Sequence, residues 1–317
     1  MSAFATSTRR RLLLAGLLAL TALKPLFAHA EGTRPDELSL VFMGDVMLDD
    51  GPGRVIQQGR DPFVHVAKLW RDADIRIANL ECVVARTGQA IADKPYTFRA
   101  HPRVLSVLRR HVDVVSLANN HSGDYGRDAF AEMLTRLQQT GIGFFGGGMN
   151  LHAAHKPYLI ERKGLRIALL GYNEMFPRHF EAGPSHPGSA WSEDAQVVAD
   201  IEDARRVHHA DLVIPFMHWG EEHRPTANDR QRELARKMID AGADAVVGTH
   251  PHVIQDTETY QGKPIIYSLG NFVFDGFSDA ANNQGWVLHM QLNRQGVTQW
   301  RVDRVVMDRE GVPRPAP

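Results

Sequence analysis

The stretch Ala245-Val246-Val247-Gly248-Thr249-His250-Pro251-His252 contains the pattern that decides the fold. Its short apolar run, bounded by a glycine, is typical of a strand buried in a sheet. Two histidines separated by one residue follow the run. Residues i and i+2 of an extended segment lie on one face, so both imidazoles can reach one centre. Because imidazole is the commonest metal ligand among neutral side chains, the stretch predicts a strand that ends at a metal site.

The same order of apolar run and polar cluster recurs on both sides of this stretch. Further strands are predicted over residues 38–42, 74–78, 112–117, 165–170, 212–216 and 265–267. Helical spacing covers residues 127–140 and 230–241, and a glycine follows each helix. Strands that alternate with helices predict an α/β fold. Alternating apolar residues from Gln284 onward (Trp286, Leu288, Met290, Leu292) predict antiparallel strands.

Two further segments are predicted to be irregular. Residues 182–192 are rich in Gly, Pro and Ser, which favours a loop, either a lid beside the site or, with slight preference, a surface excursion. The proline-rich end from Val312 is expected to fray. Cys82, the single cysteine, follows a strand-like run and is interpreted as a small buried apolar residue rather than a reactive thiol.

The N-terminal residues 1–30 have the composition of a signal peptide. Three arginines, Arg9 to Arg11, precede a short leucine-rich run, and Ala28-His29-Ala30 is typical of a cleavage site. This predicts export to the periplasm or cell envelope. The paired arginines are also found in twin-arginine signals. The alternative is that the segment is retained as an anchor. Removing four basic and no acidic residues would change the net charge from −1 to −5. No basic patch remains to indicate a nucleic-acid partner.

The polar residues at successive strand ends are expected to meet in space, because functional groups gather at the carboxyl ends of parallel strands. They include a third imidazole, His218, two carboxylates, Asp45 and Glu81, and the amide of Asn120. Mixed nitrogen and oxygen ligands suit a first-row divalent cation better than calcium. The alternative interpretation is that these residues are helix caps and turns.

These motifs also carry a family resemblance. In order and type, the following segments resemble the CapA family of poly-γ-glutamate capsule biosynthesis: Gly44-Asp45-Val46-Met47, Asn79-Leu80-Glu81, Ala118-Asn119-Asn120-His121, His218-Trp219-Gly220, Gly248-Thr249-His250-Pro251-His252 and Tyr267-Ser268-Leu269-Gly270-Asn271-Phe272. The resemblance covers about residues 38–277, the core of a domain predicted over residues 31–317. That family is similar in turn to calcineurin-like metallophosphoesterases, which implies a four-layer αββα sandwich of the metallo-dependent phosphatase type.

The resemblance implies a role for each motif residue. It implies one or two divalent metals, of manganese, iron or zinc. Asn120, His218 and His250 would share one metal with Glu81, while Asp45, Glu81 and His252 would hold the other. His121 would act as the catalytic acid or orient the leaving oxygen; its alternative role is to order the loop. The family's first motif usually reads Asp-x-His, and this chain has Met47 in that place, a poor ligand for a hard cation.

Other polar residues have weaker assignments. Asp124 either holds the His121 imidazole or caps a helix. Glu222 either binds substrate or orients His218, and Asn271 either reaches the site or makes a turn. Lys94, Tyr96 and Arg99 form either a cationic substrate-binding segment or a solvated loop.

The predicted function is that of an exported metal-dependent phosphoesterase-like hydrolase, linked to capsule, poly-γ-glutamate or cell-wall polymers. Its partners would be an envelope polymer or phosphoester and capsule or cell-wall synthesis proteins. The alternative is a non-catalytic accessory factor for synthesis or export of an anionic envelope polymer.

Overall fold

The computed structural model describes Met1 and residues 37–317, which contain two large sheets. The predicted signal peptide lies outside these described residues. The first sheet has the order β18-β17-β16-β1-β2-β5-β6, and β15 also pairs with β1. Its strands are β1 (Leu38–Val46), β2 (Ile75–Leu80), β5 (Val114–Ser116), β6 (Gly143–Phe145), β15 (Asn271–Val273), β16 (Gln284–Asn293), β17 (Gly296–Met307) and β18 (Pro313–Pro315).

The second sheet has the order β13-β14-β12-β11-β9-β8. Its strands are β8 (Tyr158–Arg162), β9 (Leu165–Asn173), β11 (Leu212–His218), β12 (Val246–Thr249), β13 (Thr257–Tyr260) and β14 (Lys263–Ile266). Two short pairs join β3 (Val83–Val84) to β4 (Arg99–Ala100), and β7 (Gly147–Gly148) to β10 (Gly188–Ser189). The centre of each large sheet is parallel, with β1, β2, β5 and β6 in one and β9, β11, β12 and β14 in the other.

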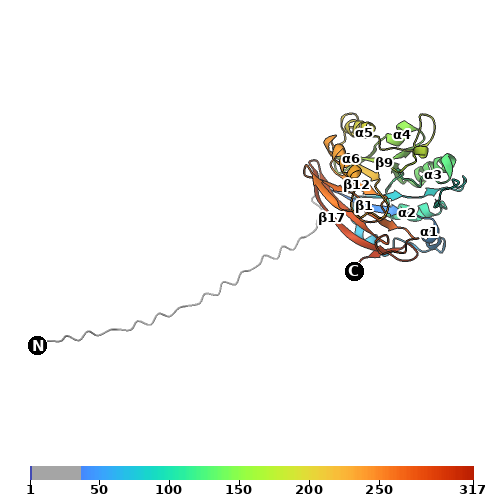
Figure 1. The fold of residues 1–317 in the computed structure, drawn as a ribbon, viewed down its shortest axis with the longest axis horizontal. Helices are drawn as coiled ribbons and strands as arrows, with labels where there is room; N and C mark the ends of the chain where they lie inside the picture. Colours follow the sequence, from blue (N-terminus) through green and yellow to red (C-terminus); the bar gives the residue numbers. More distant parts are fainter. Residues whose placement is uncertain (2–36) are drawn as a thin grey trace. The chain divides into compact units, whose positions relative to one another are not determined.

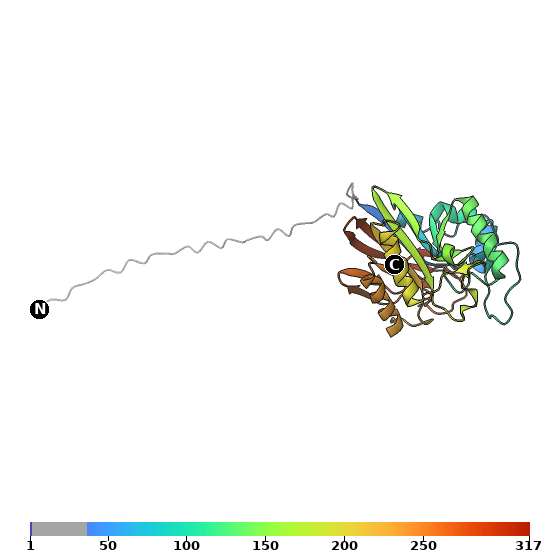
Figure 2. The ribbon, with the colours of Figure 1, turned by 90° about the horizontal axis from the view of Figure 1, so that it is seen from above.

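Helices cover the outer faces of the two sheets. They are α1 (Asp50–Gln57), α2 (Val104–His111), α3 (Gly126–Thr140), α4 (Leu151–His155), α5 (Asp194–Arg206) and α6 (Asp229–Asp240), with 3-10 turns η1 (Ala67–Trp70) and η2 (Arg178–Phe180). The first three pack on the first sheet, and the last three pack on the second. Figure 1 shows α4, α5 and α6 on one side of the fold and α1 on the other, and Figure 2 gives the same ribbon turned by 90°.

The side chains of β1 point alternately to its two faces, which explains why the sheets and helices form layers. Leu38, Leu40 and Phe42 face the core between the two sheets, whereas Val41 and Met43 face the helices. Successive side chains of a strand point to opposite faces, so a strand that is apolar at every position is covered on both faces. The result is the predicted four-layer α/β/β/α sandwich.

The predicted elements are confirmed in place, but several boundaries differ. The strands that begin at Leu38 and Leu212 continue to Val46 and His218, so they include polar residues that the prediction placed beyond them. Those polar side chains are buried, which a pattern of apolar residues does not reveal. The strand predicted over 112–117 covers only Val114–Ser116. The antiparallel strands after residue 284 are confirmed as β16 and β17.

Two predicted irregular segments are ordered instead. The C-terminal end does not fray, because Pro313–Pro315 pairs with the strand that ends at Met307. Proline is tolerated there since an edge strand needs only one ladder of hydrogen bonds. Residues 182–192 are not a plain surface excursion either, since Gly188 and Ser189 pair with β7 and Trp191 is buried.

Cys82 is buried and free, as predicted, and burial raises the pKa of its thiol. No helix among the described residues is long and apolar enough to cross a membrane.

Candidate metal centre

The six predicted metal ligands meet where the two sheets present the carboxyl ends of their parallel strands. Three come from the first sheet and three from the second. Asp45 lies near the end of β1, Glu81 follows β2, Asn120 follows β5, His218 ends β11, and His250 and His252 follow β12. All but Asn120 are buried, and Asn120 is half-buried. The prediction that these strand ends converge is confirmed by the contacts below.

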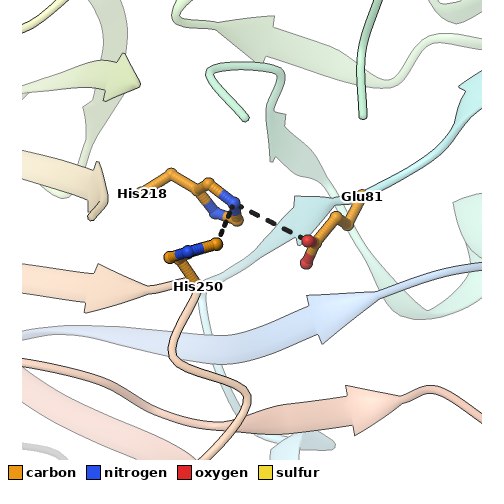
Figure 3. Close-up of side chains that lie close together, drawn as sticks. All are labelled: Glu81, His218 and His250. Atoms are coloured by element: carbon orange, nitrogen blue, oxygen red, sulfur yellow. Dashed lines mark hydrogen bonds and ion pairs between the residues drawn. The ribbon is translucent and has the colours of Figure 1, made fainter. Parts of the chain in front are cut away.

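Glu81, His218 and His250 form the first group of the centre, and Figure 3 shows their side chains pointing toward one another. Nε2 of His218 lies 3.1 Å from Nδ1 of His250 and 3.6 Å from Oε1 of Glu81. The same nitrogen is 2.8 Å from Oδ1 of Asn120. On its other side the His218 ring is held by Oγ1 of Thr249, 3.1 Å from Nδ1. Nε2 of His218 is therefore the atom that faces the group.

Asp45, Glu81 and His252 form the second group. Nδ1 of His252 lies 3.5 Å from Oδ2 of Asp45, and Nε2 lies 3.7 Å from Oε1 of Glu81. Because Oε1 of Glu81 also faces His218, this carboxylate joins the two groups. Asn79, which the prediction did not assign, donates a hydrogen bond of 2.8 Å to Oδ1 of Asp45. Its place two residues before Glu81 in an extended segment is the signal that could have identified it.

The backbone at the two histidines is unusual. His250 has φ of 99° and His252 has φ of 56°, both in the region that favours glycine. Such conformations cost about 1–3 kcal/mol each and persist only where the surroundings impose them. The amide of His250 donates to Oδ2 of Asp45 at 3.3 Å, and the same oxygen lies 3.5 Å from Nδ1 of His252. One carboxylate therefore contacts both residues of this turn. Strain of this kind is concentrated at functional sites.

Burial dominates the electrostatics of the centre. Burial raises the pKa of Asp45, and burial together with the neighbouring Asp45 carboxylate raises the pKa of Glu81 well above its usual range. Burial and the adjacent imidazoles hold the pKa of His218 and of His250 well below the usual range. Neutral imidazoles are the form that binds metals, and a cation between the carboxylates would favour their ionised form.

A divalent cation fits this set of donors. Among the described residues, Oε1 of Glu81 and Nε2 of His250 are buried without any hydrogen-bond partner. An unsatisfied buried polar atom costs about 1–3 kcal/mol, so each of these two atoms needs an explanation. A cation supplies one, since both atoms are electron-pair donors. The mixture of imidazole nitrogen with carboxylate and amide oxygen suits manganese, iron or zinc.

His121 lies beside the centre and is held by a buried carboxylate. Its Nδ1 is 2.7 Å from Oδ2 of Asp124, which is fully buried and also accepts a 2.8 Å hydrogen bond from the amide of Phe98. Asp124 does not cap α3, whose N-cap is Tyr125. Burial lowers the pKa of His121, although the Asp124 carboxylate acts in the opposite direction.

The two cationic side chains predicted to bind substrate, Lys94 and Arg99, contact other residues of the chain instead. The Lys94 ammonium donates to the Asn120 carbonyl at 2.7 Å and pairs with Asp124. Arg99 donates to the carbonyl of Gly88 at 3.0 Å and lies 4.3 Å from the centre of the Tyr125 ring. Both side chains thus brace the segment between β3 and α3.

The remaining predicted residues divide between the interior and the surface. Asn271 is buried, and its Oδ1 lies 2.9 Å from Nδ1 of His252, so it positions that ring. Glu222 is exposed and lies near His250 and His252. Tyr96 is exposed. Met47 is buried in the core between the first sheet and its helices.

Comparisons with known proteins identify the family of the chain. Residues 39–276 match the family described as bacterial capsule synthesis protein PGA_cap. The PGA biosynthesis protein CapA of Bacillus subtilis (strain 168) is 36% identical over 79% of this chain and 65% of its own length. The capsule biosynthesis protein CapA of Bacillus anthracis is 31% identical over 79% of this chain and 61% of its own. The chain thus spans less than two thirds of each of these relatives.

A more distant relative and two solved structures extend the comparison. A probable polyglutamine synthesis accessory protein of Mycobacterium tuberculosis (strain H37Rv) is 28% identical over 76% of this chain and 75% of its own. A hypothetical protein from Thermus thermophilus has TM-score 0.54 and 18% identity, covering 84% of this chain and 98% of its own. A 5'-nucleotidase precursor from the same organism has TM-score 0.51 and 12% identity, covering 88% and 56%. These two structures are similar to this chain in fold alone, and the match over residues 39–276 shows that the chain belongs to the bacterial capsule synthesis protein family PGA_cap, the CapA family.

Proposed function

We propose that this chain is an exported, metal-dependent hydrolase that acts on a phosphoester or on an anionic polymer of the cell envelope. The observation that carries the proposal is the buried centre of Asp45, Glu81, His218, His250 and His252, in which two donor atoms have no hydrogen-bond partner among the described residues. Capsule or poly-γ-glutamate as the polymer is supported by the names of the relatives. Export is supported by the composition of residues 1–30.

The chain's own residues have distinct parts in this proposal. Glu81, His218, His250 and Asn120 would hold one divalent cation, and Asp45, Glu81 and His252 a second. When bound, the metal supplies Lewis acidity toward a phosphoryl or carbonyl oxygen. His121 donates Nδ1–H to Asp124, so Nε2 is the atom at which a proton is gained or released. The capsule or cell-wall synthesis machinery is the proposed protein partner, and nucleic acid is not expected to bind.

A second function, that of a non-catalytic accessory factor, is favoured by one observation. Met47 stands where the resemblance implies a histidine ligand, and it packs in the apolar core instead of at the centre. The mycobacterial relative is also named an accessory protein. A centre of this kind would bind metal and a polymer without turning it over.

One experiment distinguishes these functions. The purified protein would be loaded with manganese, iron or zinc in turn and assayed with a generic phosphomonoester, a generic phosphodiester and a γ-linked glutamate oligomer. We expect metal-dependent turnover of at least one substrate, lost in His250→Ala. Bound metal with no turnover of any substrate would favour the accessory function, and protein that binds no metal would contradict both.

A further inference from the structure

Glu222 is an exposed carboxylate beside an otherwise buried centre. It lies in the segment between β11 and α6, and 54% of its side chain is exposed, against 1% of the His250 residue. A ligand atom from each of Glu222, His250 and His252 lies within 4.8 Å of the others. Its carboxylate lies 3.8 Å from Nε2 of the neighbouring His223, which is a long contact. Its carboxylate is therefore available on the solvent side of the centre.

The segment that carries Glu222 is fixed against the metal ligands. The amide of Trp219 donates to the carbonyl of Thr249 at 3.2 Å, and the amide of His223 donates to the carbonyl of Pro251 at 2.8 Å. The Trp219 indole also donates to the carbonyl of Tyr267 at 2.9 Å. These bonds hold the backbone on either side of Glu222 beside His250 and His252, although its side chain reaches into solvent.

Only one of the two ring nitrogens of His250 faces the first group. Its Nδ1 faces His218, whereas its Nε2 is buried and has no hydrogen-bond partner among the described residues. Carboxylates near this ring come from Glu81 in the interior and from Glu222 at the surface. Met47 contributes nothing here, since it lies in the apolar core. The centre therefore lacks a ligand that the resemblance implies, and a carboxylate that belongs to neither the first nor the second group lies on its solvent side.

We propose that Glu222 is an exchangeable metal ligand that closes the centre from its solvent side and gives way to an anionic substrate. This inference rests on the proposed metal-dependent function. A carboxylate is a good ligand for manganese or zinc, and an exposed one exchanges at little cost because water can solvate it. A phosphate or carboxylate of the substrate has the same charge and the same oxygen donors. Both would compete for one position on the cation.

The test measures Mn²⁺ binding by calorimetry to the metal-stripped full-length chain, as wild type, Glu222→Gln and Glu221→Gln. Glu221 is a matched control, since it is the adjacent exposed glutamate and pairs with Arg224 at 3.6 Å. We expect Glu222→Gln to weaken Mn²⁺ binding by about tenfold, the lower end of losses measured around metal centres. Glu221→Gln should bind Mn²⁺ as wild type does. Equal unfolding temperatures of the three metal-free proteins would show that all are folded.

A second titration tests the exchange. Inorganic phosphate would be added to each protein at saturating Mn²⁺, and we expect Glu222→Gln to bind it more tightly than wild type because the competing carboxylate is gone. Mn²⁺ affinity unchanged in Glu222→Gln, or phosphate affinity unchanged or weaker, would overturn the inference and leave the proposed function standing. A wild-type protein that binds none of manganese, iron and zinc would instead overturn the proposed function.

Discussion

At the scale of single residues, the most informative feature of the site is a set of side chains that position the histidine rings facing the centre. Asp124 fixes His121, Asn271 fixes His252, and Thr249 fixes His218. Each of these contacts sets which ring nitrogen is left to face the centre. Such supporting partners are worth about 10–100-fold in metal affinity or activity in other metal sites.

Asp124→Asn tests this at the His121 imidazole. The buried carboxylate has two partners that carry or can carry charge, His121 and Lys94, and the substitution removes its charge. We expect a loss of roughly 3 kcal/mol in the free energy of unfolding, since breaking a buried pair leaves a charge uncompensated. Denaturant unfolding measures this loss. Lys94→Met added to Asp124→Asn should restore part of the lost free energy of unfolding. An unchanged free energy of unfolding would contradict the assigned contacts.

At the scale of elements, the hydrophobic pattern was enough to predict most of the parallel strands and the helices α3 and α6, because they bury apolar residues at regular spacing, but it did not identify α2 or α5. It was not enough for α1, whose sequence Asp-Gly-Pro-Gly opens with residues that disfavour helix interiors. Nor did it predict β18, which depends on pairing with a distant strand. The candidate ligands followed from the family resemblance of the motifs, and the spacing between Asn79 and Glu81 could have identified Asn79, whereas the contacts that Lys94 makes are not encoded in sequence spacing.

Glu132 links α3 to the segment after β3 and gives a pH-dependent prediction. Burial raises its pKa, but hydrogen bonds from Thr87, Arg136 and Arg86 outweigh that and lower the pKa from 4.5 to about 2. The lowered pKa means that this stabilisation is full above pH 4.5 and is lost as the pH falls toward 2. We expect Glu132→Gln to reduce the free energy of unfolding at pH 7 by on the order of 1 kcal/mol, after allowance for solvent screening.

Denaturant unfolding of wild type and Glu132→Gln, from pH 7 downward, checks the direction in which the stability difference changes with pH. The difference between wild type and Glu132→Gln should shrink as the pH falls below 4.5. A difference that stays constant with pH would show that the lost stability comes from packing and not from the ionised carboxylate.

At the scale of the whole molecule, the two sheets and their helices place ligands from distant parts of the chain on one centre. The resemblance ended near residue 277, yet β16 pairs with β1 from Leu38 to Met43 and fills the core between the sheets with Leu288, Met290 and Leu292. The C-terminal strands are therefore part of the fold that holds Asp45.

Truncation tests this. A chain that ends after Phe277 loses β16, β17 and β18 and exposes the edge of β1 as well as the core between the sheets. We expect it to aggregate, because an exposed apolar strand edge is a template for pairing with other chains. A chain that ends after Asp308 loses only the edge strand β18 and should stay folded with a lower unfolding temperature. Cooperative unfolding of the shorter chain, followed by circular dichroism, would contradict the account.

The central claim is that Asp45, Glu81, His218, His250 and His252 form a divalent-metal centre, and metal content tests it most directly. The measurement is elemental analysis of the protein after chelation, reloading with manganese, iron or zinc and gel filtration, for wild type, His250→Ala and His155→Ala. His155 is the matched control, since it is buried and paired with Asp200 at 2.7 Å outside the centre. We predict metal retained by wild type and His155→Ala and lost from His250→Ala. Equal retention in all three proteins, or none in wild type, would contradict the account.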